Sequence, residues 1–198
     1  MQEPILSQND LQKLDDIILG FIIQKMVPSL SVLINDKVKL SSIKTSELSF
    51  EDIHDIIHPS EFQENDVGVF ITCDGDVKYG ILFYLPLSNA KKLATKLVGL
   101  EQTENLSSDG RSAVAEIGNI LAASFFNVVN EETGNEMMST VPGLAIDSVS
   151  ALIETPIIET AVSETFIHTF IELQCIDSKI TIFASIFQDP SDAKKLFK

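Results

Sequence analysis

Apolar residues recur at helical spacing in two stretches that lie one hundred residues apart. Residues 11–27 and residues 111–129 both carry them at intervals of three and four, which predicts two long amphipathic helices. The expected N-caps are Asn9 or Asp10 and Ser108 or Asp109, and the expected C-terminal stop of the second helix is Gly134. The stripe expected to be buried in the second helix consists of Ile117, Ile120, Leu121, Ser124, Phe125 and Val128.

Strand-like apolar runs occupy residues 80–85 and 180–187, and each follows a polar break with turn residues. This pattern predicts one β-hairpin in each half of the chain. The sequences SNAKKL and SDAKKL come directly after the two runs and predict a closing helix in each half. The turns are expected at 74–76 and 177–179, the closing helices at 88–93 and 191–196, further strands at 29–36 and 139–146, and short helices at 50–57 and 148–155.

These elements occur twice in the same order, which indicates an internal duplication. We expect a single domain over residues 1–198, with one pseudo-repeat in about 1–100 and a second in about 101–198. The predicted fold class is α+β, a pseudo-twofold arrangement with a largely antiparallel sheet covered by long helices.

Charge and composition narrow the possible partners. The chain has 198 residues, 44% of them hydrophobic, and a formal charge of −15, which is typical of a folded acidic protein. Thirteen of its fourteen basic residues are Lys and the remaining one is Arg111, so nucleic-acid binding is not expected. Residues 1–100 carry a net charge of −5 and residues 101–198 a net charge of −10. This acidity either attracts a basic protein surface or serves solubility.

Cysteine usage and hydropathy point to the cytoplasm. Cys73 and Cys175 cannot form a disulfide framework and occupy equivalent positions before the two turns, where small apolar residues suffice. The first ten residues lack the basic and apolar regions of a secretory leader, and we expect no membrane-spanning run of about 20 residues. His54 and His58 have a spacing that suits a metal, but an exposed acidic helix explains them as well, so no metal site is predicted.

Candidate chemistry lies on the second long helix. Ser112, Glu116 and Asn119 fall on one line along it, so Glu116 and Asn119 are neighbours. By spacing alone, this line is better explained as an ordinary solvated face, because such a Glu and Asn pair occurs by chance in many helices. Pro142 follows Asn119 after twenty-two intervening residues.

These four residues match the signature of the CheC/CheX/FliY family of chemotaxis phosphatases in type and spacing, and the chain resembles CheC in its length and its duplicated layout. The resemblance implies hydrolysis of the aspartyl phosphate on a CheY-like response regulator. Asn119 would orient the attacking water and Glu116 would pair with a Lys of the receiver, while Ser112 would support the helix start and Pro142 would bend the chain. The Mg²⁺ ion would come from the phosphorylated receiver, and we expect no cofactor on this chain.

The first half departs from this pattern. Its aligned positions hold Asp16 and Leu19, so the amide that would orient water is missing, and one working site is expected. The alternative is a non-catalytic scaffold on the same fold, similar to the middle domain of FliM. CheD, which works with CheC in this family, is a candidate partner, and the choice between monomer and dimer stays open.

Overall fold

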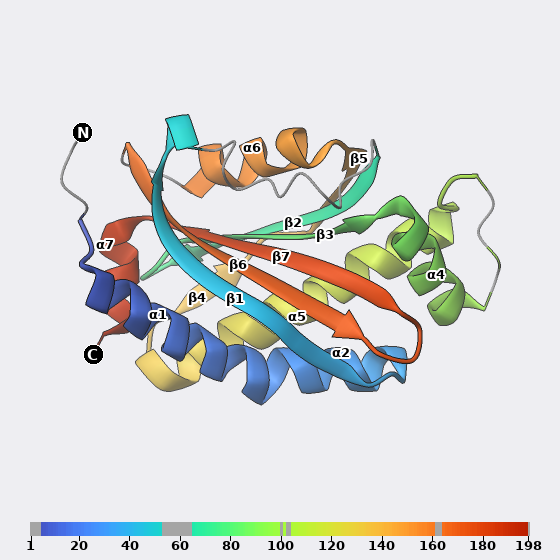
Figure 1. Ribbon diagram of the computed structural model, residues 1–198, viewed down its shortest axis with the longest axis horizontal. Coiled ribbons are helices and arrows are strands. Elements are labelled where there is room, and N and C mark those ends of the chain that lie inside the picture. The colour runs from blue at the N-terminus through green and yellow to red at the C-terminus, as the bar shows by residue number, and fades with distance from the viewer. Residues whose placement is uncertain (1–4, 53–64, 100, 102–103, 161–163, 198) are drawn as a thin grey trace.

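The fold is built around one antiparallel sheet of seven strands, described by a computed structural model for residues 5–52, 65–99, 101, 104–160 and 164–197 (Figure 1). The strand order is β1-β6-β7-β3-β2-β4, and β5 also pairs with β2. The strands are β1 (Val38–Ser49), β2 (Asp66–Gly75), β3 (Tyr79–Pro86), β4 (Met137–Ser139), β5 (Gly143–Asp147), β6 (Thr165–Cys175) and β7 (Ile180–Gln188). The α+β class with an antiparallel sheet is therefore confirmed.

The two halves of the chain exchange their edge strands. β1 of the first half pairs with β6 of the second, so that Val38 faces Cys175 and Ser49 faces Thr165. Conversely, β4 and β5 of the second half pair with β2 of the first. The two predicted hairpins, β2–β3 and β6–β7, are both present and meet where β3 pairs with β7. Each half thus completes the sheet of the other.

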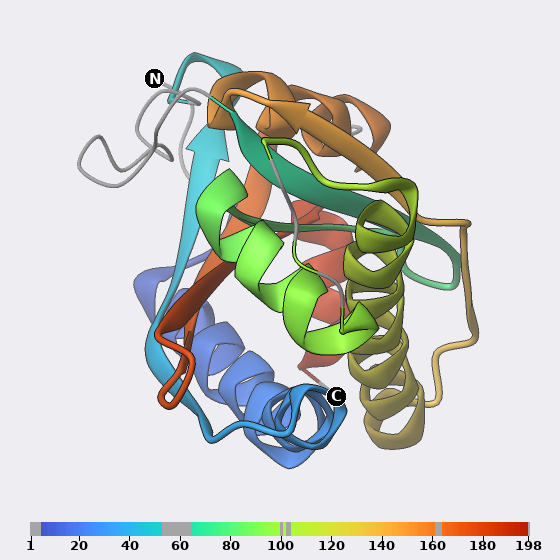
Figure 2. The ribbon, with the colours of Figure 1, turned by 90° about the vertical axis from the view of Figure 1, so that its right-hand side faces the viewer.

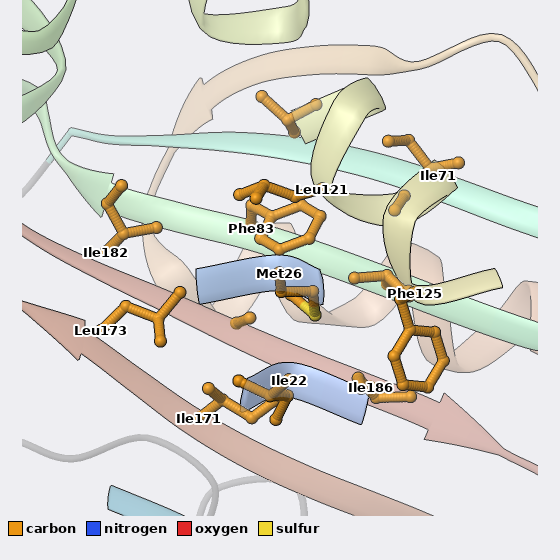
Figure 3. Packing of buried hydrophobic residues seen from close by; sticks show 14 of the residues in the cluster. Ile22, Met26, Ile71, Phe83, Leu121, Phe125, Ile171, Leu173, Ile182 and Ile186 are labelled. Atoms are coloured by element: carbon orange, nitrogen blue, oxygen red, sulfur yellow. The ribbon is translucent and has the colours of Figure 1, made fainter. Parts of the chain in front are cut away.

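Long helices cover one face of this sheet. The first consists of α1 (Gln8–Phe21), a π-helical turn (Ile22–Met26) and α2 (Val27–Ile34), and the second is α5 (Ser108–Thr133). Figures 1 and 2 show both against the same side of the strands. Ile22 and Met26 from the first helix meet Leu121 and Phe125 from the second above the sheet (Figure 3). This face holds the main hydrophobic core.

A shorter helix, α6 (Val149–Thr160), lies on the opposite face (Figure 1). Its Leu152, Ile153 and Ile157 pack on aromatic and aliphatic side chains of the central strands. The members of this second cluster on the sheet include Leu82, Tyr84, Phe166, Phe183 and Phe187. The closing helices are α4 (Leu87–Val98) and α7 (Pro190–Ala193), and a 3₁₀ turn (Lys194–Leu196) follows α7.

Several local expectations need correction. The predicted strand at 29–36 is largely the helix α2, because Leu30 and Ile34 are four residues apart and both turn into the core. The caps are Ser7 and Ser107, each within two residues of the nearest position expected. Gly134 does end α5, with a φ of 71°. Of the segment 50–57, Phe50–Asp52 form a 3₁₀ turn and the rest lies outside the described residues.

The expectation that no apolar run is long enough to span a membrane also fails. Gln8–Ile34 and Ser108–Thr133 are both long and apolar enough by length and composition. Here they are core helices, because each buries one side against the sheet while polar residues such as Gln12 and Glu116 stay exposed. Their apolar character follows from packing on a wide sheet.

Candidate functional site

The helix that carries the motif begins at Ser107, whose side chain accepts a hydrogen bond from the backbone N–H of Gly110 at 3.0 Å. Leu106, just before the cap, is buried, and Arg111 donates from Nε to its carbonyl oxygen at 3.5 Å. Ser112 is exposed in the second turn. The helix start that Ser112 was expected to support is instead capped by Ser107, five residues earlier.

In the middle of the motif the helix approaches the sheet very closely. Gly118 is buried, and a Cβ atom placed on it would lie 2.5 Å from Cγ1 of Val69 in β2. Real Cβ atoms do not come this close to a neighbouring atom. The absence of a side chain at Gly118 thus sets how near α5 lies to β2.

The motif residues lie on one flank of α5. Successive helical residues are turned by about 100°, so Ser112, Glu116 and Asn119 fall on one flank, and Ser124 is turned away from them by roughly 80° to 140°. Ser124 hydrogen-bonds Ser29 of α2 at 3.2 Å, which places the motif flank away from the first helix. Figure 2 shows the segment with β4 and β5 on the side of α5 that faces away from the first helix.

Glu116 is exposed and Asn119 is half-buried at its position next to the edge of the sheet. Among the residues that the structure describes, neither side chain forms a hydrogen bond or an ion pair within the protein. The carboxylate and the amide are both available to a partner that approaches this flank.

Pro142 lies in the edge strand beside α5, between β4 and β5. Ser139 faces Cys73 and Gly143 faces Phe70, so three residues on this edge oppose two on β2. Such an extra residue is a β-bulge, where the missing N–H of a proline costs no ladder hydrogen bond. The Thr140 side chain fixes the bulge through hydrogen bonds with Thr72.

The same strand ties Pro142 to the motif helix. Val69, which lies under Gly118, is paired with Leu144, two residues after Pro142. The twenty-two residues between Asn119 and Pro142 therefore complete the helix and return along the sheet edge to its flank. The four motif residues lie around one stretch of α5 and the edge beside it.

The first half presents a different surface at the equivalent place. Asp16 is exposed and accepts a hydrogen bond from Gln12 at 3.4 Å, and Leu19 is half-buried. Ile18, which is fully buried, stands where the second helix has Gly118. This flank has a carboxylate but no amide at the position equivalent to Asn119, and the Ile18 side chain prevents the close approach seen at Gly118.

The two cysteines are unsuited to nucleophilic catalysis. Burial raises the pKa of the Cys73 thiol to about 12 and that of Cys175 to about 11, so neither forms a thiolate at neutral pH. Within the described part of the chain, no group of three His, Cys, Asp or Glu side chains could hold a metal. His54 and His58 lie outside the described residues.

Two features escaped sequence analysis. Asp66 at the start of β2 is fully buried with both carboxylate oxygens unpaired, and burial raises its pKa to about 6. A pocket of about 330 Å³ opens between α6 and the sheet, lined by Gly68, Phe70, Leu82 and Asp147 among others. Both lie on the α6 side of the sheet and so are separate from Glu116 and Asn119.

No protein family model matches the chain. The CheY-P phosphatase CheC of Bacillus subtilis (strain 168) is 25% identical over 135 residues, which is 66% of this chain. The match spans 64% of CheC, less than two thirds of that protein's length.

Solved structures share the fold over a larger part of the chain. FliY of Thermotoga maritima superposes with a TM-score of 0.73 at 14% identity, covering 98% of this chain and 96% of that one. The FliM–SpeE complex of H. pylori matches with a TM-score of 0.64 at 15% identity over 97% and 96%. The CheX–CheY–BeF₃–Mg²⁺ complex of Borrelia burgdorferi matches with a TM-score of 0.54 at 13% identity over 89% and 96%. The chain thus shares its fold with these solved chemotaxis proteins and is similar in sequence to CheC.

Proposed function

We propose that this protein hydrolyses the aspartyl phosphate of a CheY-like receiver, with one active site on the outer flank of α5. The observation that carries the proposal is that Glu116 and Asn119 lie one turn apart on that flank. Neither side chain is bonded to another described residue. A free carboxylate and a free amide, one turn apart, can contact one partner together.

The proposed reaction requires only two side chains of this protein, Asn119 and Glu116. Water attacks the phosphorus of the acyl phosphate, the bond from phosphorus to the aspartyl oxygen breaks, and the receiver carboxylate leaves with the electron pair. Asn119 accepts a hydrogen bond from the water and holds it in line, and an amide suits this role because it does not titrate. Glu116 pairs with a receiver Lys, while the receiver's own Mg²⁺ offsets charge on the phosphoryl oxygens.

The relatives support this proposal. CheC is named as a CheY-P phosphatase, and the complex from Borrelia burgdorferi joins CheX to CheY with BeF₃ and Mg²⁺. This chain retains the Glu and the Asn of the motif.

The test follows phosphate release from a phosphorylated CheY receiver of the source organism. Asn119→Ala should lower kcat at least tenfold, and Glu116→Lys should raise KM, because the first places water and the second docks the receiver. Asn127→Ala is the matched control, since Asn127 is an exposed amide two turns further along the same helix. An Asn119→Ala variant as active as the wild type would overturn the mechanism.

A second candidate is a binding scaffold of the flagellar-switch type. The matches to FliY and to the FliM–SpeE complex cover nearly the whole chain, and the first half lacks the amide. This alternative expects receiver binding without turnover. Binding of the BeF₃⁻-activated receiver, together with an unchanged rate of phosphate loss, would favour the scaffold.

Location and further partners complete the proposal. We place the protein in the cytoplasm, where receivers are phosphorylated, with CheD as a candidate regulator. Co-purification of tagged CheD with this protein, compared with the tag alone, tests that pairing.

A further inference from the structure

We propose that the contact between Gly118 and Val69 positions the catalytic flank, so that Gly118 is a positioning residue for the water-orienting Asn119. This inference deepens the proposed phosphatase function and rests on it. Gly118 would not touch the substrate, and it acts by setting how deep α5 sits on β2.

Gly118 is an unfavourable residue for the interior of a helix. In a helix interior, glycine costs about 1 kcal/mol relative to alanine, and Gly118 lies in the eleventh position of a helix of 26 residues. Alanine would fit the hydrophobicity of the buried side equally well. The cost is explained by the distance to the sheet, because a Cβ atom would lie 2.5 Å from Cγ1 and 3.0 Å from Cβ of Val69.

Val69 cannot move aside. Its side chain is 1% exposed, and its backbone is paired with Phe83 of β3 on one side and Leu144 of β5 on the other. Its Cβ atom is attached directly to this fixed backbone, so no rotamer change removes that contact. A side chain on residue 118 would therefore displace the helix by about 1 Å to regain ordinary contact.

The displacement would act on the motif directly. Glu116 is two residues before Gly118 and Asn119 is the next residue, whereas Pro142 belongs to the edge strand and would stay in place. Misplacement of a catalytic group by about 1 Å can lower a rate about a hundredfold. An ion pair made by the long, exposed Glu116 side chain tolerates such a shift better.

The first half supports this reading by contrast. Ile18, at the position equivalent to Gly118, is fully buried, so that α1 meets the core through a large side chain. The first helix has neither the close approach nor an amide at the position of Asn119. The two differences occur at adjacent residues, as expected if the glycine positions the asparagine.

The experiment compares Gly118→Ala, Val69→Ile and the double variant Gly118→Ala with Val69→Ala. We expect each single variant to lower kcat at least tenfold, while the affinity for the BeF₃⁻-activated receiver changes less than threefold. The double variant should recover at least a third of wild-type kcat, because loss of Cγ1 removes the 2.5 Å contact. Only the 3.0 Å contact with Cβ of residue 69 remains, and a shift of a few tenths of an ångström relieves it. Its thermal stability should stay below wild type, since Val69→Ala removes buried methyl groups.

The matched control is Gly20→Ala in α1, where a new Cβ would have only Gln24 Nε2 at 4.0 Å as a neighbour. It should leave kcat unchanged. Recovery of activity without recovery of stability separates positioning from a merely structural role. If Gly118→Ala does not fold, the kcat values of Val69→Ile and of the double variant test whether this contact positions Asn119.

Wild-type kcat in a folded Gly118→Ala or Val69→Ile variant, or a folded but inactive double variant, would overturn the inference. A wild-type protein that does not accelerate phosphate loss would instead overturn the proposed function, and this inference with it. The two failures are thus distinguished by the wild-type rate.

Discussion

Ser7 and Ser107 cap the two long helices at positions one hundred residues apart. Each side chain accepts a hydrogen bond from the backbone N–H three residues later, at 3.2 Å from Asp10 and 3.0 Å from Gly110. Because both helices start at matching points, the alignment of Asp16 with Glu116 is a structural one. The same offset sets Ile18 opposite Gly118 and Leu19 opposite Asn119.

This equivalence predicts what is needed to rebuild the first site. In an Asn119→Ala background, Leu19→Asn should restore no measurable phosphatase activity, since Ile18 still sets the depth of the first helix. Phosphate release from the receiver is the measurement, and circular dichroism confirms folding. Restoration of wild-type rates by Leu19→Asn alone would show that helix depth has no influence.

The salt dependence of receiver binding forms a second prediction. If the net charge of −10 on residues 101–198 attracts the receiver, raising salt from about 0.05 M to 0.5 M should weaken binding several-fold. Titration calorimetry with the BeF₃⁻-activated receiver measures this. Affinity that does not change with salt would assign the acidity to solubility.

Asp36 should stabilise the end of the fold where α2 meets the β6–β7 turn. Burial opposes its ionisation, but hydrogen bonds from Ser178, from the backbone N–H of Asp177 and from Lys96 at 3.0 Å outweigh it and hold the pKa of Asp36 well below its usual range. Asp36→Asn should therefore cost about 2 kcal/mol of unfolding free energy at pH 7, measured in urea.

The pH dependence has a definite sign. A lowered pKa contributes stability above the unfolded value near 3.8 and loses it as pH falls further. The difference between wild type and Asp36→Asn should accordingly shrink below pH 4. Asp177→Asn is the control, because the Asp177 carboxylate is exposed and only its N–H is used. A constant difference from pH 3 to pH 7 would contradict this account.

The contribution of Asp66 to stability should depend on pH in the opposite sense to that of Asp36. Burial raises its pKa from 3.8 to about 6, so its contribution to stability is full below pH 3.8 and is lost as pH rises through 6. Asp66→Asn should therefore stabilise the protein by about 2 kcal/mol at pH 8 and by almost nothing at pH 3.5. Urea unfolding at the two pH values measures it, with the exposed neighbour Asp147→Asn as control. Destabilisation at pH 8 would show that the carboxylate has a favourable partner.

Sequence periodicity predicted the elements whose burial is regular. The two long helices and both hairpins bury one face or a continuous apolar run, and these signals are local. β1 was missed because VKLSSIKTSELS is a polar edge strand, protected by Lys39 and Lys44, and only its pairing with β6 makes it a strand. The prediction of a strand over residues 29–36 is wrong because the apolar run there has no clear period, and its first six residues belong to α2.

The sequence predicts which residues form the candidate site, but it does not predict how the fold supports them. The spacing of Glu116 and Asn119 puts them on one flank of any helix, and their exposure agrees with this. The role of Gly118 depends on Val69, which is 49 positions away in sequence and reaches it only through the fold. The burial of Asp66 likewise depends on strands and a helix from the other half.

The exchange of edge strands bears on how the chain folds and why its first half persists. A ribosome releases β1 more than one hundred residues before β6, its hydrogen-bonding partner, so the sheet cannot close until the C-terminal hairpin has emerged. The same exchange rests the motif helix of the second half on β2 of the first. Residues of the first half thus support the candidate site of the second, although their own helix has no amide at the position equivalent to Asn119.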